Sequence, residues 1–207
     1  MDGLIGFAVV AGMLTMLPGL DTAQVLRSAT LGGPRMAYAT LAGILCGVFV
    51  WGVAASVGIG ALLEASRTAF EALQLAGAGY LLHTGGRILW DARRPVESTD
   101  LGAGDGTRAG WVTTFARALL ITLTNPKVGL FYVAMLAPFL PEGVPPVIGG
   151  LLLAGIHNLE AIAWYSLLIW GASLAREMFA RPRVRQWMEL VSGIALVGFG
   201  LRVAFDR

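Results

Sequence analysis

The sequence predicts an all-α integral membrane protein with six transmembrane helices. Of its 207 residues, 56% are apolar and 14% are charged, and its mean hydropathy is +0.71. In a typical soluble domain, about 45–50% of the residues are apolar and about 25% are charged. The apolar residues are grouped in segments of the roughly 20 residues needed to cross a bilayer. Backbone polar groups in hydrocarbon must bond within their own segment, so these segments are expected to be helical.

Six apolar runs are the predicted spans: residues 4–26, 38–63, 68–90, 118–140, 147–174 and 187–205. The third and sixth spans are the weakest. Charged residues adjoin the start of the third span, and charged residues flank the apolar centre of the sixth. The N-terminal run has no basic segment before it and no clear cleavage site, so it is predicted to remain as the first span. The chain is therefore expected to form a single membrane domain over residues 1–207. A first repeat (1–90) and a second repeat (111–207) would be joined by a solvated cytoplasmic linker (91–110).

The arginines predict the orientation of these spans. Leaving aside Arg117, which adjoins the fourth span, ten lie in or beside the segments that follow the first, third and fifth spans, and three lie on the opposite side. Short cytoplasmic loops carry the excess of Lys and Arg. This distribution places the Arg-rich loops in the cytoplasm and both termini outside.

The first predicted span contains a helix break at Pro18-Gly19, followed by Asp21-Thr22. Proline lacks an amide hydrogen and glycine is a weak helix former, so a helix should bend or stop here. Asp21 and Gln24 have the spacing of a capping box, which predicts that Asp21 caps a restarted helix. The alternative is an ordinary proline kink with Asp21 reaching interfacial water.

The fourth span contains a second break at Asn125-Pro126-Lys127. Asn is a good N-cap and proline is favoured at the first helical position, so the chain is predicted to stop and restart there. Lys127 lies well inside the span, where a lysine costs about 2.5–3.5 kcal/mol on insertion scales. Such a residue usually faces a cavity or a partner acid.

Each half thus begins with a proline-interrupted helix. An odd number of spans per half gives the two halves opposite orientations, which is an inverted repeat. Matching interrupted helices are the best sequence indication of a transport site. Two kinked structural helices remain the alternative, but the opposite charges of Asp21 and Lys127 favour a site.

The second span carries small residues on two faces: Ala39, Gly43 and Gly47 on one, and Gly52, Ser56 and Gly60 on the other. Such faces let helices approach closely. They are predicted to be packing surfaces within the chain, with a homodimer through the Gly43/Gly47 face as the alternative.

These motifs resemble the LysE/RhtB family of amino-acid exporters, which are bacterial inner-membrane proteins of six spans. Pro18-Gly19-Leu20-Asp21-Thr22 is similar to the family's Pro-Gly-Pro-Asp-Thr signature, and Asn125-Pro126-Lys127 to its Asn-Pro-Lys motif. Leu20 departs from the first signature. Thr122 and Ala118 stand where the family often has asparagine and glycine.

The resemblance implies export of an amino acid or a small derivative, in exchange for protons. A zwitterion needs a carboxylate receptor, such as a half-helix N-terminus with Lys127, and an ammonium receptor, such as Asp21 or backbone carbonyls. The alternatives are a membrane-embedded enzyme and a scaffold subunit. The sequence has no metal cluster, activated nucleophile or phosphate loop, so neither catalysis nor a metal, cofactor or nucleic-acid partner is expected.

Glu160 is a further proton-coupling candidate, from its position alone. It falls near the middle of the fifth span, with His157 and Trp164 on the same helical face. Desolvation at that depth favours the neutral acid. His157 is predicted to relay protons to Glu160, because an unperturbed imidazole titrates near pH ~6.5. The alternative is that Glu160 neutralises Lys127 or bonds to His157.

Overall fold

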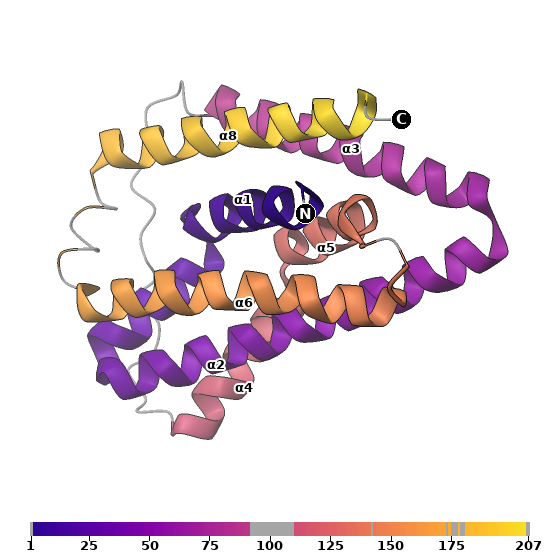
Figure 1. Ribbon diagram of the computed structural model, residues 1–207. Helices are drawn as coiled ribbons and strands as arrows, with labels where there is room; N and C mark the ends of the chain where they lie inside the picture. The colour runs from indigo at the N-terminus through magenta and orange to yellow at the C-terminus, as the bar shows by residue number, and fades with distance from the viewer. Residues whose placement is uncertain are drawn as a thin grey trace.

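The computed structural model describes residues 2–91, 110–141, 143–172, 174, 178 and 181–205. This part of the chain is helical and contains no β-strand (Figure 1). Its helices are α1 (Asp2–Met16), α2 (Leu20–Ala65), α3 (Arg67–Asp91), α4 (Trp111–Thr124), α5 (Pro126–Phe139), α6 (Pro146–Trp170) and α8 (Pro182–Phe205). The prediction of an all-α protein is confirmed for these residues.

Helix α2 folds back on itself at Gly33, which has φ +75° and is followed by Pro34. Ser28 and Thr40 hydroxyl oxygens lie 2.7 Å apart, whereas twelve residues of straight helix would separate them by about 18 Å. The chain therefore reverses at Gly33, a backbone conformation that glycine adopts readily. The predicted loop between residues 26 and 38 is wrong, because the reversal takes a single non-helical residue.

The helices are arranged in layers. α3 packs along α8, α2 packs along α6, and the short helices α1 and α5 lie between these two pairs (Figure 1). Two glycines set the first contact: a Cβ on Gly85 would lie 2.9 Å from the Gly193 carbonyl oxygen, and one on Gly193 would lie 3.1 Å from that of Gly85. This reciprocal contact brings the backbones of α3 and α8 close together.

The small-residue faces of α2 are packing surfaces, as predicted. A Cβ on Gly43 would collide with the Phe115 carbonyl oxygen, and one on Gly47 would lie 2.7 Å from Thr122 Cγ2. The Gly43/Gly47 face is thus covered by α4 of the same chain, which corrects the alternative of a homodimer through it. The other face meets α6, where a Cβ on Gly52 would lie 2.7 Å from Ala154 Cβ.

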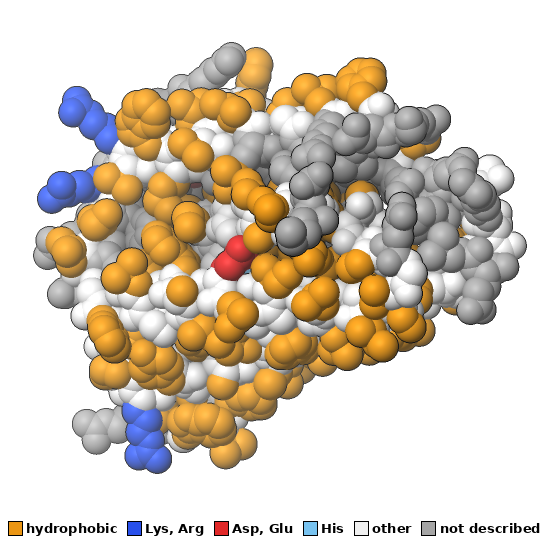
Figure 2. All heavy atoms as spheres, viewed as in Figure 1, with side chains coloured by type: hydrophobic (Ala, Val, Ile, Leu, Met, Phe, Trp, Pro, Cys, Tyr) orange, Lys and Arg blue, Asp and Glu red, His pale blue; other side chains and the backbone are white. Residues whose placement is uncertain are grey.

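Length and apolar content mark two candidate membrane spans in the described residues, or three if one bent pair of helices counts as a span. Leu20–Leu62 and Pro146–Trp170 qualify alone, and Trp111–Thr124 with Lys127–Phe139 qualify as one span bent by 58°. Hydrophobic side chains cover much of the visible surface (Figure 2), and Trp170 and Phe205 are 82% and 81% exposed. Such a surface suits a bilayer and makes the chain a multi-pass membrane protein. The predicted linker, 91–110, lies outside the described residues except for its two ends.

Candidate functional site

The first helix break lies where the sequence predicted it. α1 ends at Met16, and α2 begins at Leu20 after Leu17, Pro18 and Gly19. The N-cap is Gly19, in extended backbone and without a side-chain cap, so the prediction that Asp21 caps this helix is wrong. The helix starts two residues earlier than the capping-box spacing implied. Asp21 lies in its first turn, where the positive end of the helix dipole stabilises a negative charge.

The second break confirms its prediction. α4 ends at Thr124, Pro126 opens α5, and Asn125 is the N-cap. The Asn125 side-chain oxygen accepts a hydrogen bond of 3.0 Å from the Lys127 backbone N–H. The cap therefore fixes Lys127 in the first turn of the restarted helix.

Each proline frees one carbonyl, because it removes the hydrogen bond to the residue four positions earlier. That residue is Leu14 for Pro18 and Thr122 for Pro126. The Leu14 carbonyl accepts a hydrogen bond of 3.0 Å from Lys127 Nζ, and the Thr122 carbonyl accepts one of 3.2 Å from the Trp51 indole N–H. Both freed carbonyls thus accept a hydrogen bond from a side chain in a distant part of the chain. The Thr122 carbonyl also accepts one of 3.2 Å from the Asn125 backbone N–H.

The charged residues of the two breaks reach across to one another's helices. Lys127, in the first turn of α5, bonds to the last turn of α1. Asp21, in the first turn of α2, accepts a hydrogen bond of 3.4 Å from the Thr122 hydroxyl in the last turn of α4. Asp21 and Lys127 attract each other electrostatically, but within the described residues Lys127 makes no direct ion pair.

A cavity of about 30 Å³ lies between the two breaks. Its lining includes Gly19, Asp21, Asn125 and Lys127, and the first turns of α2 and α5 both contribute to it. Most of the remaining wall is apolar: Leu14, Leu17, Leu20, Ile44, Val48, Val128 and Ala161. A volume of this size holds roughly two water molecules, so the site must widen to admit anything as large as an amino acid.

His157 is held by two hydrogen bonds that fix its role in this conformation. The Thr15 hydroxyl donates to the Ala11 carbonyl at 2.8 Å, so its oxygen is free to accept from His157 Nε2 at 3.0 Å. Nδ1 then accepts from the Tyr132 hydroxyl at 3.1 Å. A neutral imidazole with its proton on Nε2 satisfies both bonds, and the network ties α1, α5 and α6 together.

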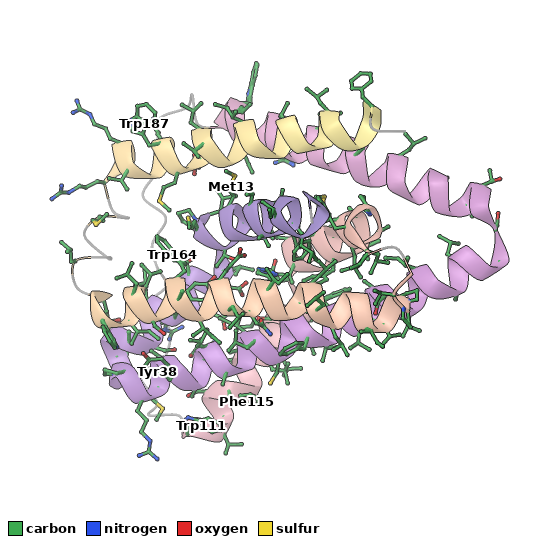
Figure 3. All side chains as sticks on the ribbon, in the orientation of Figure 1. Met13, Tyr38, Trp111, Phe115, Trp164 and Trp187 are labelled. Carbon is green, nitrogen blue, oxygen red and sulfur yellow. The ribbon has the colours of Figure 1, made fainter. Side chains whose placement is uncertain are left out.

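Glu160 lies beside this network but is not part of it. Its carboxylate oxygens approach Gly12 of α1, where a Cβ would be 3.6 Å from both, and Oε2 is buried without a hydrogen-bond partner. Neither the predicted bond to His157 nor contact with Lys127 is formed. Trp164, one turn further along, lies on the side of α6 that faces α1 (Figure 3). A proton relay from His157 to Glu160 stays a prediction with no contact in its support.

The structure gathers most of the residues that the sequence singled out: Gly19, Asp21, Thr22, Asn125, Lys127 and His157 all line the cavity. Sequence reasoning missed Trp51, Thr15 and Tyr132, whose partners lie 71, 142 and 25 residues away. The only local signal was a polar group within an apolar run. Nothing in the spacing predicted their partners.

Two broken helices whose first turns meet at a cavity are typical of membrane transporters. The chain belongs to the LysE type translocator family, whose model matches residues 13–207. It is a transporter and not an enzyme.

Three relatives have similar lengths. The chain is 28% identical to a leucine efflux protein of Enterobacter sp. (strain 638), over 96% of this chain and 93% of the relative. It is 30% identical to an uncharacterised membrane protein of Pseudomonas aeruginosa, over 91% and 88%. It is 24% identical to the Bacillus subtilis membrane protein YrhP over the full length of both. No solved structure matches the chain.

Proposed function

We propose that this protein exports a neutral, apolar amino acid across the bacterial inner membrane in exchange for protons, through the cavity between the two helix breaks. The observation that carries the proposal is the meeting of Asp21, Lys127 and two helix N-termini at one cavity. Half-helix N-termini at matching breaks are typical of sites for anionic substrate groups.

The cavity offers a receptor for each end of a zwitterion. The N-terminal turns of α2 and α5, with the Lys127 ammonium, suit a carboxylate. The Asp21 carboxylate suits an ammonium group. Because the two charged residues are not already joined in an ion pair, a zwitterion can engage each without breaking a direct contact between them.

The apolar wall favours an aliphatic side chain. Leu14, Ile44, Val48 and Val128 supply hydrophobic contact and no further charge for a basic or acidic substrate. The leucine efflux proteins among the relatives support this choice. Leucine is therefore the first substrate to test.

The proposed frame is six spans in two inverted repeats, 1–90 and 111–207. α1 with the first arm of α2 would form the first span, and α4 with α5 the fourth. The pairing of corresponding helices supports this frame: α2 packs on α6, α3 on α8, and each broken helix packs on the second span of the other half, α1 on α6 and α4 on α2.

We also propose that both termini face the outside. The described Lys and Arg side chains visible in Figure 2 lie toward one end of the molecule, where the Gly33 reversal and the start of α8 are found. In Figure 1 the C-terminus lies beyond the middle of the molecule, away from that end, and the N-terminus lies near the middle. The positive-inside rule assigns the basic end to the cytoplasm.

The proton is proposed to travel on an acid of this region. Asp21 faces the cavity, and Glu160 adjoins Ala161 in its wall. Glu160 Oε2 has no hydrogen-bond partner, so a proton can occupy it without displacing one. His157, whose ring nitrogens are both engaged, is the weakest of the three predicted carriers.

Transport into and out of liposomes tests the proposal. Purified protein is reconstituted, the vesicles are loaded with labelled amino acids, and efflux is followed with and without a pH gradient. We expect leucine efflux that accelerates with the gradient. Absence of efflux across a broad amino-acid panel would contradict the proposal, and efflux indifferent to the gradient would contradict its proton exchange alone.

A further inference from the structure

We infer that substrate binding releases the first helix break selectively, because the substrate's carboxylate competes with the Leu14 carbonyl for Lys127. This inference rests on the proposed function. It depends on a difference between the two breaks in how their freed carbonyls are satisfied.

The first freed carbonyl is held from within the transport site. Lys127 Nζ donates to the Leu14 carbonyl at 3.0 Å, and both residues line the cavity. Gly19 is packed close to the same ammonium group, since a Cβ there would lie 3.5 Å from Nζ. Anything anionic that enters the cavity therefore meets the group that holds the end of α1.

The second freed carbonyl is held from outside the site. The Thr122 carbonyl accepts from the Trp51 indole N–H at 3.2 Å and from the Asn125 backbone N–H at 3.2 Å, and Trp51 does not line the cavity. Its ring packs against Gly129 in the first turn of α5, where a Cβ would lie 2.7 Å from two of its carbon atoms. Trp51 thus braces both sides of the second break, and a substrate in the cavity does not compete for it.

A carboxylate is a stronger acceptor than a carbonyl for an ammonium donor. When the substrate takes Lys127, the Leu14 carbonyl loses its side-chain donor and is left unsatisfied in an apolar region, which is unfavourable. α1 can relieve this by moving at Pro18-Gly19, while α4 and α5 stay joined by Trp51. The cavity, too small for an amino acid as it stands, would widen on the α1 side.

Hydrogen-exchange mass spectrometry of the full-length protein tests this without and with leucine. Without ligand, Lys127→Met removes the donor, so amide exchange in residues 13–17 should rise several-fold. Trp51→Phe keeps an aromatic side chain but removes the N–H, while the Asn125 backbone N–H still bonds to the Thr122 carbonyl. Exchange should therefore rise only around residues 122–126, and by less than Lys127→Met raises it in residues 13–17. Trp164→Phe is the matched control, since the indole nitrogen of Trp164 has no hydrogen-bond partner, and should leave both segments unchanged.

With leucine present, the wild type should show faster exchange in residues 13–17 only, and Lys127→Met should show no further increase. Unchanged exchange at 13–17 in ligand-free Lys127→Met would overturn the contact's role. If leucine binds, as measured separately by a thermal shift, but amide exchange in the wild type is unchanged, then the release of the first break on binding is contradicted. The role of the contact between Lys127 and Leu14 would still stand. Binding of no amino acid on the panel would contradict the proposed function and the release together.

Pro18→Ala is a second variant, and it leaves the charged side chains of the site in place. It restores a backbone N–H that can satisfy the Leu14 carbonyl and free Lys127. We expect a lower apparent KM for leucine together with a lower maximal rate, since the release is no longer linked to binding. An unchanged KM in a folded Pro18→Ala protein would contradict the inference.

Discussion

Removing the Tyr132 hydroxyl tests the hydrogen-bond network that joins α1, α5 and α6. Tyr132 is 0% exposed and His157 is 5% exposed, and the bond between them is 3.1 Å. Tyr132→Phe would leave the ring in place and leave His157 Nδ1 buried without a donor. The position of α6 against α1 should therefore weaken with little change in packing.

The size of the effect follows from two limits. Hydrogen bonds between membrane helices contribute about 0.6 kcal/mol on average and about 1.7 at most. Leaving a buried acceptor unsatisfied costs about 1–3 kcal/mol. Because this acceptor belongs to a buried side chain, we expect Tyr132→Phe to lower the free energy of unfolding by about 1.5 kcal/mol.

The assay is reversible unfolding of purified protein in mixed micelles with increasing SDS. Tyr38→Phe is the control, because Tyr38 is 38% exposed and lies outside the network. Thr15→Val removes the acceptor for Nε2, and the double variant should show coupling of at least about 0.5 kcal/mol, since both bonds act on one imidazole. A Tyr132→Phe protein as stable as Tyr38→Phe would refute the tautomer and the network.

The remaining predictions concern transport and packing. Lys127→Ala should abolish leucine efflux from liposomes while the protein still inserts; undiminished efflux would show that Lys127 is only a packing residue. Asp21→Asn should eliminate the acceleration of leucine efflux by a pH gradient. Because Asp21 is not the helix cap, full retention of this acceleration would mean that the charge of Asp21 is not used in proton exchange. Glu160→Gln should keep leucine exchange but lose that acceleration, whereas a wild-type pH profile would leave Asp21 as the carrier. Gly43→Val should destabilise the protein by about 1–3 kcal/mol in the SDS assay through collision with α4, while Gly58→Val, with open space around it, should be nearly neutral; equal effects would contradict the α2–α4 contact.

The sequence predicted much of the local structure. Proline and glycine marked both breaks, and Asn125 was recognised as a cap because its motif is contained in three consecutive residues. Asp21 satisfied the same kind of local rule, yet Gly19 took the N-cap position. Spacing alone cannot decide between two neighbouring starts of a helix when either residue can adopt an extended backbone.

The reversal at Gly33 and the partners of the freed carbonyls were beyond local rules. The uncharged run and the arginines suggested a loop after residue 26, whereas the Gly33-Pro34 pair turns the chain within one residue. Trp51 and Lys127 each bond to a carbonyl more than 70 residues away. Such pairings depend on how the halves pack, which hydropathy and spacing do not encode.

Binding of leucine and two blocked analogues to the purified protein tests the central claim, that one cavity between the breaks receives both ends of a zwitterion. Thermal shifts are measured with leucine, leucine methyl ester and N-acetyl-leucine, for the wild type and for Lys127→Met. Leucine should stabilise the wild type, with much weaker effects from the ester, which lacks the carboxylate, and from the acetylated compound, which lacks the ammonium group. Lys127→Met should lose the response to leucine. Equal stabilisation of the wild type by all three compounds, or an unchanged response in Lys127→Met, would contradict the assignment of the site.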